Sequence, residues 1–69
     1  MNIVVVDNIK DVAMQLHKQV EQQILEPETT KDERERLVEA QQSLGGAIRY
    51  LLQAIGIDVE RVMSRRVEQ

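Results

Sequence analysis

One stretch of sequence decides the fold: residues 37–52, which read LVEAQQSLGGAIRYLL. Apolar side chains recur there every three or four residues, and a helix gathers such positions on one stripe. The stripe comprises Leu37, Ala40, Leu44, Ala47, Ile48, Leu51 and Ile55. We therefore expect a long amphipathic helix over residues 30–55 that buries this stripe against a second helix.

The same helix carries a second, narrower stripe of small and apolar residues. A two-helix hairpin needs only the first stripe, so the second predicts a contact with another copy of the chain. The interface residues that we expect are Ser43, Gly46, Ala47, Tyr50 and Ala54. Gly45 and Gly46 each cost roughly 1 kcal/mol relative to alanine in mid-helix. Two interpretations of this cost stay open, namely a kink or the close approach of another helix.

The other expected elements follow from local signals. A first helix is predicted over residues 8–25, with Asp7 or Asn8 as its N-cap. Its apolar stripe comprises Ile9, Val12, Ala13, Leu16, Val20 and Ile24. The β-branched residues 3–6 predict that residues 1–7 form an extended arm. Pro27 ends the first helix, because proline disfavours a helical residue before it.

The second helix has clear start and stop signals. Thr30 and Glu33 have the spacing of a capping box, which predicts a helix beginning at Lys31. Gly56 predicts a left-handed C-cap, and Asp58 then begins a short third helix over residues 58–66. The expected fold is all-α: an antiparallel helical hairpin with a short C-terminal third helix and an extended N-terminal arm, in one domain spanning residues 1–69.

The size of the chain predicts an oligomer. Sixty-nine residues bury little apolar surface, and the chain contains no cysteine for a disulfide. The net charge of −3 argues against binding duplex nucleic acid, which needs a basic face. No apolar run is long enough to cross a membrane, and the N-terminus lacks the basic start of a signal peptide. We therefore expect a cytoplasmic protein with no membrane contact.

The sequence contains few candidate catalytic residues. His17 is the one histidine and lies at the edge of the first helix's apolar stripe, where we expect a surface residue. Metal-ligand spacings and a phosphate-binding glycine loop are missing from the sequence. We therefore expect no enzyme activity, no cofactor and no metal.

Two places offer binding chemistry. At the hairpin corner, Thr29, Thr30 and Lys31 combine two hydroxyls, an ammonium and the amides of a helix N-terminus, which suit a phosphate. The alternative is that Thr30 only caps its helix and Lys31 is solvated. Arg49 and Tyr50 form the second place, where the single aromatic ring anchors a ligand base or packs in a dimer.

Four segments carry a resemblance to a known family. They are residues 9–16 (IKDVAMQL), the corner with Pro27, Thr29 and Thr30, residues 37–40 (LVEA) and residues 44–49 (LGGAIR). Together they resemble the helical hairpin of the phage anti-CBASS and anti-Thoeris nucleotide sponges. The small-residue run of that family usually contains an asparagine, which residues 44–49 lack. The resemblance implies immune evasion by a non-enzymatic protein that sequesters cyclic di- or trinucleotide messengers in pockets between the subunits of a homo-oligomer. It also implies that Thr29, Thr30 and Lys31 contact phosphate, that Arg49 donates to the ligand and that Tyr50 packs on a base or at the interface.

Two other classes of function stay open. A small dimeric helical module would bind and inhibit or adapt a host or phage protein, with Met14, Leu25 and the third helix as its contact set. A nucleic-acid regulator would pair residues 3–6 as a strand in a dimer, although the acidic balance disfavours it.

Overall fold

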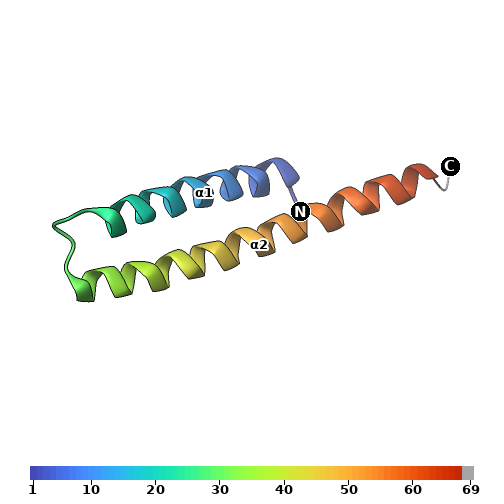
Figure 1. Ribbon diagram of the computed structural model, residues 1–69. Coiled ribbons are helices and arrows are strands. Elements are labelled where there is room, and N and C mark those ends of the chain that lie inside the picture. Colours follow the sequence, from blue (N-terminus) through green and yellow to red (C-terminus); the bar gives the residue numbers. More distant parts are fainter. Residues whose placement is uncertain (68–69) are drawn as a thin grey trace.

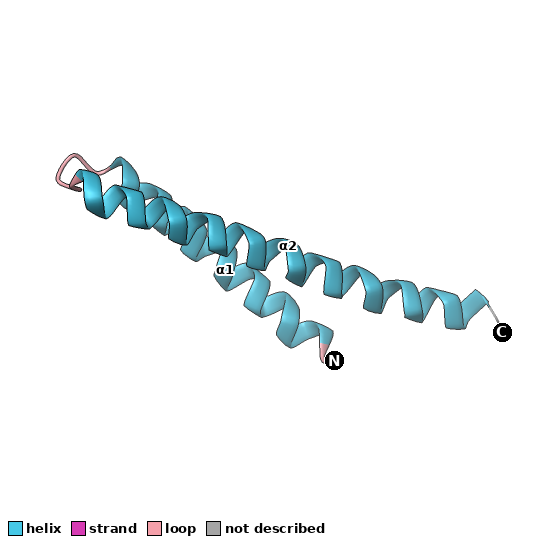
Figure 2. Cartoon of the chain, turned by 90° about the horizontal axis from the view of Figure 1, so that it is seen from below, coloured by secondary structure: helices cyan, strands magenta, loops and turns pink. Residues whose placement is uncertain are grey.

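The computed structural model describes residues 1–67, and within them the side chains of residues 1–61 and of Met63. This part of the chain forms two α-helices, α1 (Ile3–Leu25) and α2 (Lys31–Val67). The helices lie antiparallel and side by side, and α2 continues beyond the N-terminus of α1 (Figures 1 and 2). The molecule is a rod 59 Å long and 15 Å across. The predicted all-helical antiparallel hairpin is confirmed.

The N-terminal arm is replaced by helix. Asn2 caps α1, because its Oδ1 accepts hydrogen bonds from the backbone N–H of Val4 at 3.1 Å and of Val5 at 3.2 Å. The extended arm over residues 1–7 and the cap at Asp7 or Asn8 were therefore wrong predictions. Asparagine caps as well as aspartate does, and a β-branched residue costs only some tenths of a kcal/mol in a helix. A single strand, in contrast, would have no partner for its backbone groups.

The third helix is also absent as a separate element. Residues 58–66 belong to α2, which passes through Gly56 without a break, and none of the described glycines has a positive φ. The side of α2 that faces α1 explains this continuity. Its half-buried positions Leu51, Ile55 and Asp58 follow one another at intervals of four and three residues across Gly56. A break at Gly56 would interrupt this packing, at a higher cost than one glycine in a helix.

The two helices pack along one narrow seam. In α1 the buried and half-buried positions along this seam are Ile3, Val6, Lys10, Ala13, His17, Val20 and Ile24. In α2 they are Leu37, Gln41, Leu44, Ile48, Leu51, Ile55 and Asp58. Both sets alternate steps of three and four residues, which is the heptad spacing of a coiled coil. Ala13 is the one fully buried residue among the side chains that are described.

The seam confirms the predicted stripe of α2 at its five large residues, whereas Ala40 and Ala47 are exposed at its edge. In α1 the prediction was half wrong, because Ile9, Val12 and Leu16 are exposed. Lys10 and His17 take their places in the seam, so His17 is half-buried and not a surface residue. The physical reason is how far each apolar stripe continues along α1. The stripe through Lys10 and His17 continues to Val20 and Ile24 at the corner, whereas the other stripe continues into glutamines.

Lys10 shows how a cation is accommodated in the seam. Its Nζ lies 2.9 Å from Oδ1 of Asp7 and 3.2 Å from Oδ1 of Asp11, and its side chain is 18% exposed. Hydrogen bonds to Asp7 and then to Asp11 raise the pKa of Lys10 above its ordinary value. The aliphatic stem therefore lies in the seam while the ammonium reaches carboxylates on the surface of α1.

The start of α2 is a reciprocal cap, as predicted. The backbone N–H of Thr30 donates to Oε1 of Glu33 at 2.9 Å, and the backbone N–H of Glu33 donates to Oγ1 of Thr30 at 3.2 Å. The bond from the Thr30 backbone, and secondarily that with its side chain, holds the pKa of Glu33 below its ordinary value. The carboxylate therefore favours the folded corner in its charged form.

We predict that truncating the seam destabilises the hairpin more than truncating an exposed leucine does. Leu44→Ala should lower the free energy of unfolding by about 2 kcal/mol, the low end for a leucine truncation, because Leu44 is half-buried. Leu52→Ala is the matched control, because Leu52 is exposed on the same helix. Urea denaturation followed by circular dichroism measures both. Equal losses would contradict the described seam.

We also predict a pH signature of the cap. A lowered pKa in the folded state means that the contribution of Glu33 is fully present above its ordinary pKa of 4.5 and is lost as the pH falls through the lowered pKa. Glu33→Gln keeps a capping side chain that does not titrate. The wild type should be the more stable protein at pH 7, and its advantage should disappear on acidification in thermal unfolding. An advantage that stays constant down to pH 2.5 would show that Glu33 does not act through its charge.

Candidate functional site

The hairpin corner is held together by polar bonds that connect the two helices. Arg34 donates from Nε to the carbonyl of Ile24 at 2.9 Å and from Nη2 to the carbonyl of Thr29 at 3.2 Å. Oγ1 of Thr29 donates to the carbonyl of Gln23 at 2.6 Å. The bonds to Gln23 and Ile24 satisfy carbonyls in the last turn of α1, and the bond to Thr29 holds the connection between the helices. Sequence reasoning missed this role of Arg34, although an arginine one turn into α2 stands opposite those carbonyls.

The corner has consequences for the three residues predicted to contact phosphate. The Thr29 hydroxyl proton is already used in the bond to Gln23, and the Thr30 oxygen accepts from Glu33. The Thr30 hydroxyl also interacts with the Glu33 carboxylate, whereas Lys31 is exposed. An anion at the corner would therefore meet the Lys31 ammonium beside the negative charge of Glu33.

Arg49 and Tyr50 lie on the outer side of α2, away from α1. Both are exposed, and Tyr50 is 72% accessible. Tyr50 follows Lys31 by 19 residues of continuous helix, which corresponds to about 28 Å at about 1.5 Å per residue. One chain therefore does not bring the two halves of the predicted ligand site together.

The predicted interface residues of α2 are partly open to solvent. Ser43, Ala47 and Tyr50 are exposed, and Gly46 and Ala54 are half-buried. A Cβ placed on Gly45 or Gly46 would meet no atom within 4 Å apart from nearby backbone of the same helix. Close approach of α1 therefore does not require either glycine, and contact with another chain remains a prediction.

A continuous apolar surface lies exposed on α1, at residues of which all but Val5 were predicted to be core. We call Val5, Ile9, Val12 and Leu16 the outer face of α1; these residues are 51%, 50%, 55% and 44% exposed. They line a shallow hollow of about 390 Å³ together with Asn8 and Ala13. Periodicity identified this stripe correctly as apolar. It did not reveal that the hairpin leaves the stripe uncovered.

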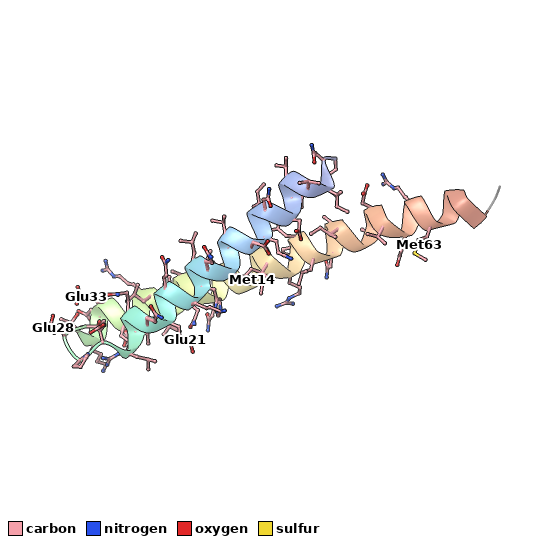
Figure 3. All side chains as sticks on the ribbon, turned by 90° about the horizontal axis from the view of Figure 1, so that it is seen from above. Met14, Glu21, Glu28, Glu33 and Met63 are labelled. Atoms are coloured by element: carbon pink, nitrogen blue, oxygen red, sulfur yellow. The ribbon has the colours of Figure 1, made fainter. Side chains whose placement is uncertain are left out.

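Other exposed apolar side chains are scattered. Met14 lies over the middle of α1, and Met63 lies on the part of α2 that extends past α1 (Figure 3). Met14 shares a small hollow with His17, Lys18 and Ile48. This hollow belongs to the side of the hairpin opposite the outer face of α1.

The described residues contain no group of three histidines, cysteines or acidic side chains placed to hold a metal ion. Neither α1 nor the described length of α2 is apolar over enough residues to cross a membrane. Comparison of the chain with known protein families, with curated proteins and with solved structures gives no match.

Proposed function

We propose that this chain is a non-enzymatic binding protein that sequesters cyclic oligonucleotide messengers in pockets between the subunits of a homo-oligomer, like the phage nucleotide sponges it resembles. The exposed Tyr50 beside Arg49 is the observation that carries the proposal. Tyr50 is the single aromatic residue of the chain, and it is 72% exposed in the hairpin. Aromatic rings stabilise a small domain best when buried, so a ring left in water indicates a surface that another molecule covers.

The chemistry of this pair suits a nucleotide. Stacking of a base on an aromatic ring is worth about 1–3 kcal/mol and tolerates different bases. The guanidinium of Arg49 presents paired N–H donors that match a phosphate. Lys31 adds a second exposed cation at the corner. Together they supply one stacking surface and two positive charges, as a cyclic nucleotide with several phosphates requires.

The distance between these groups supports a pocket made by more than one chain. Lys31 and Tyr50 are separated by about 28 Å of rigid helix, so a small ligand cannot touch both within one hairpin. A site that uses both cations therefore takes them from two subunits. Such a site sequesters its ligand by enclosing it and needs no catalytic group.

We predict that cyclic nucleotides stabilise the protein against heat. A panel of cyclic di- and trinucleotides should include at least one that raises the melting temperature, by a free energy of RT ln(1 + [L]/Kd). Tyr50→Ala should abolish the shift and Tyr50→Phe should retain it, because stacking needs the ring and not the hydroxyl. Leu52→Ala, exposed on the same helix, serves as the control and should leave the shift unchanged.

The fate of the ligand separates binding from catalysis. Nucleotide released by heating the complex should be chemically intact when analysed by chromatography. Degraded nucleotide would identify an enzyme, and the absence of a thermal shift with every member of the panel would remove the proposal.

A second candidate is a helical module that binds another protein. The observation that favours it is the end of α2, which extends past α1 (Figure 1) and exposes Val59 and Met63. Leu25, also in the predicted contact set, is exposed at the opposite end of the rod. If this candidate holds, a stoichiometric partner captured from host lysate should be lost with Met63→Glu and kept with Tyr50→Ala. The reverse dependence would favour the nucleotide site.

A further inference from the structure

We infer that the outer face of α1 is covered by a second copy of the chain, with the α1 helices of the two copies packed antiparallel about a two-fold axis. This inference rests on the proposed function only in that both require more than one subunit. It adds the surface through which two subunits meet. Four features of the hairpin support it.

The first feature is the absence of charge around the outer face of α1. The residues that flank it are uncharged and polar, namely Asn8, Gln15, Gln19, Gln22 and Gln23. At about 100° per residue, an arc of about 140° on α1 contains no ionisable side chain. The charged residues Asp7, Asp11, Lys18 and Glu21 lie on the other side of the helix. A partner that placed charged side chains against this surface would lose the hydration of those charges without compensation. The outer face of α1 in another copy carries no charged side chain and avoids this cost.

The second feature is continuity between the two helices. Met14, His17 and Ile48 line a hollow on one side of the hairpin. Helical spacing places Ala47 on the other side of α2 from that hollow, and Ala40 and Ala54 recur at intervals of seven residues along the same line. The outer face of α1 and this alanine line therefore lie on the same side of the hairpin. Met1 lies at the end of this surface, in a hollow that it shares with Ala54 and Ile57 and with the charged residues Asp58 and Arg61.

The third feature is size. A stable dimer buries about 800 Å² on each partner. One long side of the rod, 59 Å by 15 Å, has about this area, and the part of it beside the 23 residues of α1 supplies roughly 500 Å². The hairpin exposes 5806 Å² in total and fully buries Ala13 alone among its described side chains. A second copy on this side would convert exposed aliphatic surface into the centre of a four-helix arrangement.

The fourth feature is the helix dipole, which determines the relative direction of the two α1 helices. Antiparallel packing places the positive end of one α1 dipole beside the negative end of the other, whereas parallel packing brings like ends together. In an antiparallel pair Val5 meets the partner's Leu16, and Ile9 meets the partner's Val12. A two-fold contact of this kind is self-complementary and closed, so it stops at two subunits.

The direct test is the mass of the ligand-free protein in solution, measured by light scattering at micromolar concentration. The wild type should have twice the mass of the chain. Leu16→Glu should reduce it to the mass of one chain, because two carboxylates would be buried at each dimer contact. Met14→Glu is the matched control: Met14 is equally exposed, at 44%, but lies on the other side of α1, so this variant should stay dimeric. A monomeric wild type, or equal effects of the two substitutions, would overturn the inference.

A second measurement covers the case in which Leu16→Glu does not fold. The chain has no cysteine, so one introduced thiol reports one position. Val12→Cys should give covalent dimers with a short bis-maleimide, and Met14→Cys should not. Failure of Val12→Cys to cross-link in a dimeric protein would place the interface on another surface and would leave the nucleotide proposal standing. Efficient cross-linking of a protein that no cyclic nucleotide stabilises would support the interface and remove the nucleotide proposal.

Discussion

The structure depends on a seam that is only one stripe wide. Each helix contributes one line of side chains at heptad spacing, and Ala13 is the single fully buried residue among those described. Two helices cannot surround a core, because each leaves most of its circumference in water. The seam leaves three features outside it: the outer face of α1, the alanine line of α2 and the Tyr50 ring. The polar corner compensates in part, because Arg34 and the capping box connect the helices without using apolar area.

This constraint also shapes how the chain can act. Most hydrogen-bonding groups of the corner hold the two helices together. The corner therefore offers a ligand the cation of Lys31 and not a complete anion site. Arg49 and Tyr50 take no part in the hydrogen bonds of the corner and lie on the far side of α2 from α1. A binding site in such a thin rod has no cleft of its own in which to enclose a ligand. In the proposed site, a second subunit would supply this enclosure.

The parts of the fold that local chemistry controls were predictable from sequence. Pro27 ended α1, and Thr30 with Glu33 started α2, because each signal acts within three residues. The errors arose where a local signal competed with packing. Gly56 resembles a C-cap but lies within a seam that continues through Asp58. α1 has two apolar stripes of similar strength, and hydrophobic periodicity alone does not tell which one faces α2 and which one faces outward. The candidate site was predictable as residue types on α2, whereas the 28 Å that separates its halves becomes apparent only once α2 is one continuous helix.

The central claim is that the hairpin does not stand alone and that association with another copy stabilises it. The most direct test is thermal unfolding by circular dichroism over a thousandfold dilution of the ligand-free protein. Because association couples folding to concentration, the melting temperature should fall steadily with dilution, and helix signal should be lost at the lowest concentrations. A melting temperature and helix content that stay constant across the whole series would contradict the claim.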